Sequence, residues 1–189
     1  SAAQMYPDGF RTFVEGEGVS DRWEGASRPG HFRGVATLVL KLFEAVQPTT
    51  AYVGQKDYQQ AHLIRRMVAD LNLPLVVRVM PTVREPDGLA MSSRNRYLNP
   101  RERRQATVLF RALQAAQARL RAGERSPKRL TELMRQLIKR EPLVRLDYAA
   151  VVDADTLEPV ERARGSVAFL VAAWVGSTRL IDNLLVEVS

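Results

Sequence analysis

The sequence contains no cysteine and only two histidines, His31 and His62. The absence of cysteine excludes disulfide bonds, thiolate metal ligands and a cysteine nucleophile. The two histidines do not form a zinc-binding spacing such as His-Glu-x-x-His, so a structural zinc site is not expected. The sequence therefore predicts no metal ion held by protein side chains alone.

Long apolar runs are also absent. A membrane-spanning helix needs about 20 consecutive apolar residues, and no segment reaches that length. The first ten residues, SAAQMYPDGF, have neither a basic region nor a long apolar region of the kind that targets a protein for secretion. We therefore expect a cytoplasmic protein that does not bind membranes.

The size and charge of the chain set its class. Its 189 residues are 46% hydrophobic, which suits one large or two small globular domains. The formal charge of +7 and a pI near 10.2 are typical of proteins that meet polyanions, among them nucleotides, nucleic acids and anionic membranes.

Many of the arginines lie along one predicted helix that also carries an apolar stripe. We interpret them as a solvated helix face opposite that stripe, because aromatic residues do not alternate with them as stacking on bases would require. A nucleic-acid partner is therefore not expected. The arginines concerned are Arg101, Arg103, Arg104, Arg111, Arg119, Arg121 and Arg125.

In the first part of the chain, segments with strand-like and helix-like apolar spacing alternate. Such alternation favours a parallel sheet with crossover helices, which is an α/β fold. The expected elements are a short strand at 10–14, a helix at 35–46, a strand at 50–53, a helix at 57–71 and a strand at 75–80.

The second part has a different pattern. Asn99 as N-cap, Pro100 and Glu102 predict the start of a long helix that ends near Gly123. Ser126-Pro127 predicts the start of another, which makes a helical hairpin. Three strands follow, at 144–152, 167–175 and 180–188. We expect two domains, a nucleotide-binding part at 1–82 and an α+β domain with antiparallel strands at 83–189.

One candidate site lies where the strand at 50–53 ends, in the segment GQKDYQQ. Ligands of open α/β sheets bind at the carboxyl ends of strands. Gly54 would let a ligand approach the backbone, Lys56 supplies positive charge, Asp57 can accept bonds from ribose hydroxyls, and Gln60 adds an amide. Alternatively, Asp57 is only a helix cap and Lys56 a surface charge, which leaves Gln59 and Gln60 unexplained.

A second candidate site is the segment REPDGLAMSSRNRYL, which begins at Arg84. Asp87-Gly88 is typical of a turn. Ser92, Ser93 and Arg94 place two hydroxyls, neighbouring backbone N–H groups and a guanidinium together, which would suit a triphosphate. The alternative is a solvated loop followed by a helix cap.

These two segments, together with EGASRPGHFRGVATLV and VAAWVGSTRLIDN, resemble the pantothenate synthetase (pantoate–β-alanine ligase) family over essentially the whole chain. The resemblance implies part of a Rossmann-like nucleotidyltransferase domain followed by a smaller α+β domain. It also implies an ATP-dependent ligase that joins pantoate to β-alanine through a pantoyl adenylate, with pantothenate, AMP and pyrophosphate as products. Mg²⁺ and a homodimer belong to the same expectation.

The resemblance also implies roles for individual residues. Lys56, Ser92, Ser93 and Arg94 would be catalytic, and Gln60 and Arg28 would bind pantoate. Val83 would contact adenine through its backbone. The full set implied to contact ATP is Gly54, Gln55, Lys56, Asp57, Val83, Met91, Ser92, Ser93 and Arg94.

The family begins with a strand and an HxGH-type loop, and neither occurs in this sequence. We therefore expect a C-terminal fragment that binds ATP weakly and catalyses poorly alone. Two alternatives stay open. One is another adenylate-forming or tRNA-binding domain of the class I synthetase type. The other is a structural fragment whose exposed sheet edge serves association.

Overall fold

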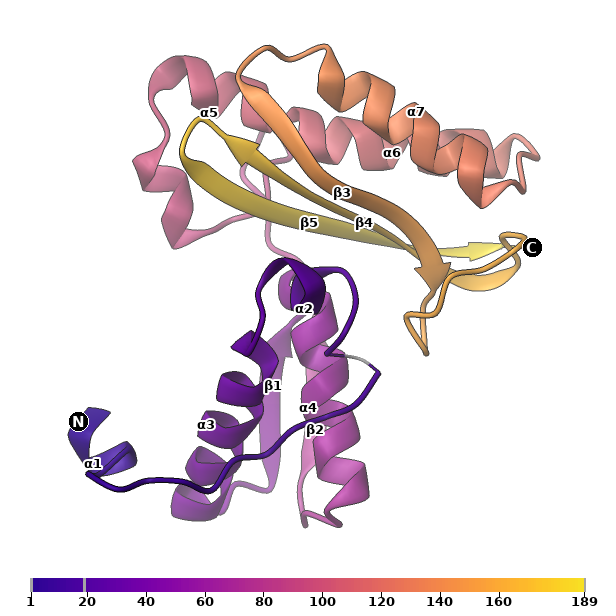
Figure 1. Cartoon of the computed structure of the whole chain (residues 1–189). Coiled ribbons are helices and arrows are strands. Elements are labelled where there is room, and N and C mark those ends of the chain that lie inside the picture. Colours follow the sequence, from indigo (N-terminus) through magenta and orange to yellow (C-terminus); the bar gives the residue numbers. More distant parts are fainter. Residues whose placement is uncertain (1, 19, 189) are drawn as a thin grey trace. The chain divides into compact units, whose positions relative to one another are not determined.

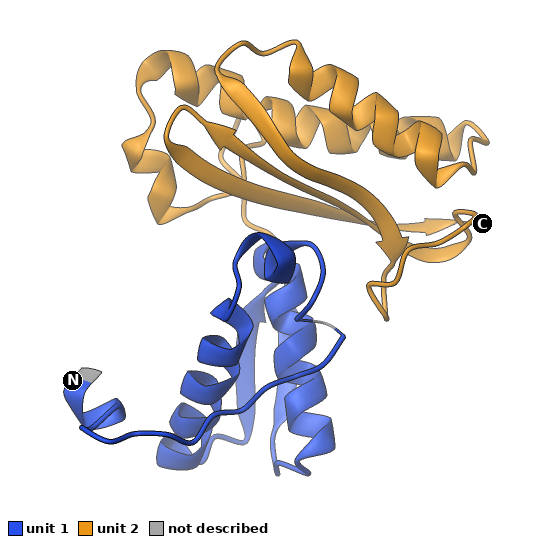
Figure 2. Ribbon diagram, viewed as in Figure 1, with its two compact units in different colours: residues 1–80 blue, residues 81–189 orange. Residues whose placement is uncertain are grey.

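The computed structural model describes residues 2–18 and 20–188 (Figure 1). It divides into two compact units, Ser1–Met80 and Pro81–Ser189, which are coloured separately in Figure 2. Each unit has its own hydrophobic core. The fold is α/β in the first unit and α+β in the second, as the sequence predicts.

The first unit is built around a two-stranded parallel sheet. Its strands pair from Thr50 with Val76 to Gly54 with Met80, and helix α4 makes the crossover between them. The predicted parallel arrangement is therefore confirmed. The elements in order are α1 (Ala2–Met5), α2 (Glu24–Ser27), α3 (His31–Val46), β1 (Thr50–Gly54), the 3₁₀ turn η1 (Gln55–Asp57), α4 (Tyr58–Asp70) and β2 (Val76–Met80).

Helices α3 and α4 form the core of this unit, in which Phe32 and Ala36 cluster with Leu63 and Met67. Phe32 and Ala36 lie one helical turn apart, as do Leu63 and Met67, so each helix presents one apolar face. The apolar stripe predicted for the segment 35–46 is therefore part of a longer helix that begins at His31.

The strand expected at 10–14 does not form, and this prediction is wrong. Residues 10–16 have no regular secondary structure. The backbone N–H of Val14 donates to Thr37 Oγ1 on α3 at 2.9 Å, and the guanidinium carbon of Arg33 lies 3.8 Å from the centroid of the Phe13 ring. The segment thus makes its backbone hydrogen bond and its aromatic contact with helix α3. Strand pairing would instead require the edge of a neighbouring strand.

The second unit contains a three-stranded antiparallel sheet in the order β3-β4-β5. The strands are β3 (Val144–Asp153), β4 (Gly165–Val175) and β5 (Thr178–Val188). A tight turn joins β4 to β5, since Val175 pairs with Thr178. All three predicted strands are confirmed, each with a small shift in its ends.

Helices α6 and α7 lie side by side on one face of this sheet (Figure 1). The helical elements are the 3₁₀ turn η2 (Ser93–Tyr97), α5 (Pro100–Ala106), α6 (Val108–Arg121) and α7 (Pro127–Lys139). The core of this unit lies between the helices and the sheet. Its fully buried side chains include Leu109, Leu113 and Leu120 from α6, Leu130, Met134 and Ile138 from α7, and Phe169, Val171 and Val175 from β4.

Local capping sets the start of the helices. Asn99 Oδ1 accepts the backbone N–H groups of Arg101 and Glu102, and Glu102 Oε2 accepts the N–H of Asn99 at 2.9 Å. This is the predicted capping box.

The single long helix expected up to Gly123 is instead two helices separated at Thr107, whose hydroxyl donates to the carbonyl of Arg104 at 2.8 Å.

None of the helices in the described ranges 2–18 and 20–188 is long and apolar enough to span a membrane.

Candidate functional site

The segment Gly54–Asp57 leads directly from strand β1 into helix α4. A Cβ atom built on Gly54 would meet no other atom within 4 Å, so the backbone there is open to a ligand. Lys56 Nζ lies 3.9 Å from Asp57 Oδ1, and the Asp57 side chain is 52% exposed. The Asp57 side chain makes no capping hydrogen bond to α4. Helix capping therefore does not account for this carboxylate.

Gln59 has a structural role that the sequence did not reveal. Its amide is buried, accepts the backbone N–H of Glu24 at 3.0 Å and donates to the carbonyl of Arg22 at 2.8 Å. These two bonds flank Trp23, which has φ 51° and ψ −112°. A non-glycine residue in such a conformation is strained, and the surrounding contacts must hold it. Gln59 therefore fixes the segment that leads into α2.

Arg28 directly follows α2 and belongs to a small polar cluster. Its Nη1 donates to Nε2 of His31 at 2.9 Å, and the same nitrogen lies 4.0 Å from Glu24 Oε2. The Arg28 side chain is 36% exposed, whereas that of Glu24 is 9% exposed. The guanidinium is thus held from one side by its neighbours and remains accessible to an anion from solvent. Gln60, on α4, is half-buried.

In the second unit, residues 83–91 form a tight hairpin loop. The N–H of Met91 donates to the carbonyl of Val83 at 2.9 Å, and the N–H of Glu85 donates to that of Leu89 at 2.8 Å. Gly88 has φ +92° at the turn, where a side chain would collide with the ring of Phe110. The predicted Asp87-Gly88 turn is therefore confirmed. Val83 and Met91 are both exposed.

The Asp87 carboxylate ties this hairpin loop to helix α5. Arg103 donates to both of its oxygens, at 2.6 and 3.1 Å, and Asp87 Oδ1 accepts the N–H of Leu89 at 3.2 Å. The hydrogen bonds from Arg103 are the main cause that holds the pKa of Asp87 below its usual value. Arg103 is therefore a structural ion-pair partner and not only a solvated charge. Arg125 is likewise half-buried, with Nη1 donating to the Leu120 carbonyl at 2.6 Å.

Ser92, Ser93 and Arg94 follow the hairpin loop directly. Ser92 Oγ accepts the N–H of Arg94 at 3.2 Å and so caps the 3₁₀ turn η2. Arg94 Nη1 donates to the carbonyl of Arg179 on β5 at 3.3 Å. Ser93 and Arg94 are exposed, and Ser92 is half-buried. The Arg94 guanidinium is therefore anchored to strand β5, directly after the two serines in the chain.

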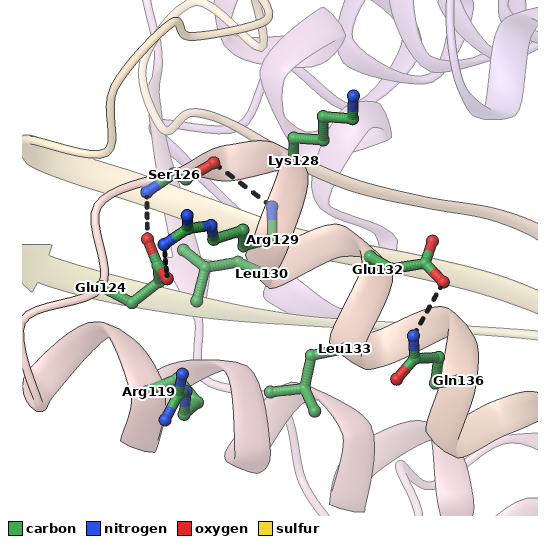
Figure 3. Close-up of a pocket in the computed structure, with 9 residues that line it drawn as sticks. All are labelled: Arg119, Glu124, Ser126, Lys128, Arg129, Leu130, Glu132, Leu133 and Gln136. Carbon is green, nitrogen blue, oxygen red and sulfur yellow. Dashed lines mark hydrogen bonds and ion pairs between the residues drawn. The ribbon is translucent and has the colours of Figure 1, made fainter.

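A hollow of about 800 Å³ lies on the second unit along helices α6 and α7 (Figure 3). It contains none of the residues that the sequence predicts to bind ATP or pantoate. Its polar groups bond one another: Glu124 Oε1 accepts the N–H of Ser126 at 2.9 Å, and Glu132 Oε1 accepts Gln136 Nε2 at 3.1 Å. The bond from Ser126 is the main cause that lowers the pKa of Glu124. This hollow is therefore not the candidate site.

The chain is similar in sequence to known ligases. A family sequence model described as pantoate-beta-alanine ligase matches residues 1–185. The pantothenate synthetase of Roseiflexus castenholzii is 56% identical over 187 residues, which is 99% of this chain and 67% of that protein. The pantothenate synthetase of Moorella thermoacetica is 54% identical over 98% of this chain and 66% of its own length.

Solved structures give the same result. Pantothenate synthetase from Thermus thermophilus superposes with a TM-score of 0.93 at 46% identity, over 97% of this chain and 67% of that chain. Pantoate-beta-alanine ligase from Francisella tularensis, complexed with beta-gamma ATP and beta-alanine, gives a TM-score of 0.73 at 31% identity, over 97% of this chain and 61% of that chain. The chain thus spans about two thirds of the length of these proteins. It belongs to the pantoate–β-alanine ligase family.

Proposed function

We propose that the chain contributes to ATP-dependent ligation of pantoate and β-alanine. A pantoate carboxylate oxygen attacks the α-phosphorus of ATP, and the bond to pyrophosphate breaks. The amine of β-alanine then attacks the acyl carbon of the pantoyl adenylate, and AMP leaves as pantothenate forms. The observation that carries this proposal is the family match over residues 1–185, which includes both candidate segments. The ligands of the Francisella structure support the choice of ATP and β-alanine.

In the first unit, the segment Gly54–Asp57 is proposed to bind the nucleotide. The backbone at Gly54 is open to a ligand. Gln55, the next residue, would also contact ATP. The half-exposed Asp57 carboxylate would accept hydrogen bonds from the ribose hydroxyls, since an ionised carboxylate is an acceptor only. Lys56, on the same turn, would donate to a phosphate oxygen. Its side chain is 20% exposed, so the surrounding protein restricts the positions of its ammonium group.

Gln60 and Arg28 are proposed to bind pantoate. The Gln60 amide has two donors and one acceptor, which suits a substrate that carries both hydroxyl and carboxylate groups. The partly exposed Arg28 guanidinium would pair with the carboxylate before adenylation. Its contact with His31 fixes the orientation of Nη1.

In the second unit, Val83 and Met91–Arg94 are proposed to contact ATP. The Val83 carbonyl already accepts the N–H of Met91, so an adenine amino group would use the second lone pair of that oxygen. Ser92, Ser93 and Arg94 would donate to the phosphates and stabilise charge as it moves onto pyrophosphate. Catalysis of this kind depends on alignment and electrostatics more than on covalent chemistry by the protein.

The remaining parts of the proposal concern Mg²⁺, assembly, location and domain roles. Across residues 2–18 and 20–188, no group of three His, Cys, Asp or Glu residues could hold a metal ion. Mg²⁺ would therefore be held mainly by ATP phosphates, where it would neutralise charge. We further propose a cytoplasmic homodimer, in which residues 1–82 bind nucleotide and residues 83–189 carry the phosphate-binding loop.

Isotope exchange between pyrophosphate and ATP tests the proposed reaction. Adenylation is reversible, so exchange should require pantoate and should not require β-alanine. The assay uses the longest natural form of the protein. Exchange that depends on an amino acid instead, or tight and salt-dependent RNA binding, would favour a synthetase-type domain. The family match already disfavours that alternative.

A further inference from the structure

The guanidinium group of Arg84 joins the hairpin loop to strand β5. Nη1 lies 2.6 Å from Asp182 Oδ2 and Nη2 lies 3.0 Å from Asp182 Oδ1, so the contact is bidentate. Nη1 also donates to the carbonyl of Gly88 at 3.0 Å, and Nη2 donates to that of Asn183 at 3.2 Å. The guanidinium carbon lies 3.8 Å from the centroid of the Phe110 ring.

Burial makes this ion pair a weak source of stability. The Asp182 side chain is 2% exposed and that of Arg84 is 18% exposed. Desolvation of two charges offsets their attraction, so apolar residues of similar volume often stabilise a protein equally well. The two residues are 98 positions apart in the sequence. What the pair supplies is a fixed geometry between a loop and a strand.

The geometry at Arg84 is transmitted to the serines by the backbone. Arg84 forms an isolated antiparallel bridge with Ala90, and the N–H of Met91 donates to the carbonyl of Val83 at 2.9 Å. Asn95 Nδ2 then donates to the carbonyl of Ala90 at 3.1 Å. A displacement of Arg84 therefore moves the residues that immediately precede Ser92.

A second attachment holds the far side of the serines. Arg94 Nη1 donates to the carbonyl of Arg179, which is also on β5. Arg179 in turn donates to Asp147 Oδ2 from Nε at 3.0 Å and from Nη2 at 2.7 Å, which ties β5 to β3. Ser92 and Ser93 thus lie between two attachments to the same strand.

We propose that the Arg84–Asp182 pair is a positioning element for Ser92, Ser93 and Arg94. It holds these donors where the phosphates of ATP are to bind, and it acts through the hairpin loop without touching substrate. The inference rests on the proposed function for its catalytic consequence. Misplacing catalytic donors by about 1 Å costs about a hundredfold in rate.

The test replaces the pair by apolar residues in the longest natural form of the protein. The double variant Arg84→Met/Asp182→Leu removes both members of the pair, so neither of them is left as an unpaired buried charge, and folding should be retained. Its matched control is Arg111→Met/Glu141→Leu, which removes a 2.6 Å ion pair of the same unit. The single variant Arg84→Lys keeps the charge but loses the bidentate contact.

We expect the double variant to melt close to the control while kcat for pantoate-dependent exchange falls by about a hundredfold. The KM for pantoate should stay unchanged, because its proposed ligands, Gln60 and Arg28, are in the first unit. Arg84→Lys should lie between the parent and the double variant. Normal kcat in a folded double variant would overturn the proposal, and so would normal kcat in Arg84→Lys if the double variant does not fold.

Amide hydrogen exchange separates this inference from the proposed function. The N–H groups of Glu85 and Met91 close the hairpin loop, and they should exchange roughly tenfold faster in the double variant or in Arg84→Lys. The N–H of Val171, in the core of β4, should be unaffected. Unchanged exchange at Glu85 and Met91 would refute the positioning role. An inactive parent protein would refute the proposed function alone, since hydrogen exchange would still decide the positioning role.

Discussion

At the scale of single residues, each proposed segment is rich in hydrogen-bond donors. In the first unit Lys56 can donate to an anion and Asp57 can accept from ribose hydroxyls, and in the second unit Ser92, Ser93 and Arg94 can donate. Side chains of these types would align a polyanion without supplying a nucleophile. That suits the proposed adenylation, in which the substrate carboxylate would itself be the nucleophile.

Lys56→Ala should abolish most of the pyrophosphate exchange without unfolding the protein. The loss of one preorganised donor to developing charge costs about 2.7–4 kcal/mol, or roughly a hundred- to a thousandfold in rate. Stability should change little, because the ion pair between Lys56 and the half-exposed Asp57 carboxylate is long, at 3.9 Å. Exposed ion pairs typically contribute about 0.2–1 kcal/mol. The measurement compares exchange rates and melting temperatures of the variant and the parent protein.

Arg66→Ala is the matched control for this variant. Arg66 lies on helix α4, is 73% exposed and pairs with Asp70 at 2.7 Å, so its loss removes a surface charge of the same unit. It should leave the exchange rate unchanged. A Lys56→Ala variant that exchanges as fast as this control would rule out the assigned role of Lys56.

At the scale of elements, the hairpin loop is held to its own unit by two ion pairs of different character. Arg84–Asp182 is buried against β5, whereas Arg103–Asp87 is partly exposed at 28% and 46%. Exposed pairs typically contribute about 0.2–1 kcal/mol. The Arg103–Asp87 pair is therefore expected to contribute little to stability, and its contribution should depend on pH.

Asp87→Asn should destabilise the second unit slightly at neutral pH and not at all in acid. The pKa of Asp87 is lowered from 3.8 in the folded protein. The pair therefore stabilises the fold fully above the unfolded pKa near 3.8, and this contribution is lost as the pH falls through the lower folded pKa. Urea unfolding of the variant and the parent protein from about pH 7 to about pH 2 measures the difference. A gap in stability that persists at the acid end of this range would contradict this account.

Local signals predicted much of the fold, because caps and turns involve neighbouring residues. Asn99 and Glu102 form the predicted capping box, and Asp87-Gly88 forms the predicted turn. The split of the long helix at Thr107 was missed, since a hydroxyl that bonds a carbonyl three residues earlier is only one option for a threonine. The strand expected at 10–14 failed because alternation alone does not provide a partner strand.

Contacts between distant segments were not predictable from one sequence. The role of the Gln59 amide depends on Arg22 and Glu24, which are 37 and 35 positions away. The partner of Arg84 is 98 positions away. The family resemblance implies which residues meet the ligand, and that assignment stays a prediction. They did not indicate which side chains hold the segments in place.

At the scale of the whole molecule, the small parallel sheet has an unusual surface. Parallel sheets are normally covered on both faces, yet Tyr52, Val76 and Met80 are 67%, 58% and 47% exposed. The chain spans about two thirds of the length of its relatives. Activity should therefore be compared between this chain and a longer form that also carries the part of a relative that this chain does not match.

The most direct test of the central claim is AMP release from ATP in the presence of pantoate and β-alanine. It should be measured side by side with this chain and with a version extended by the part of the Roseiflexus castenholzii relative that this chain does not match. AMP release should require both substrates, at least in the extended form. If neither form releases AMP when both substrates are present, the assignment of the two segments to a ligase site is contradicted.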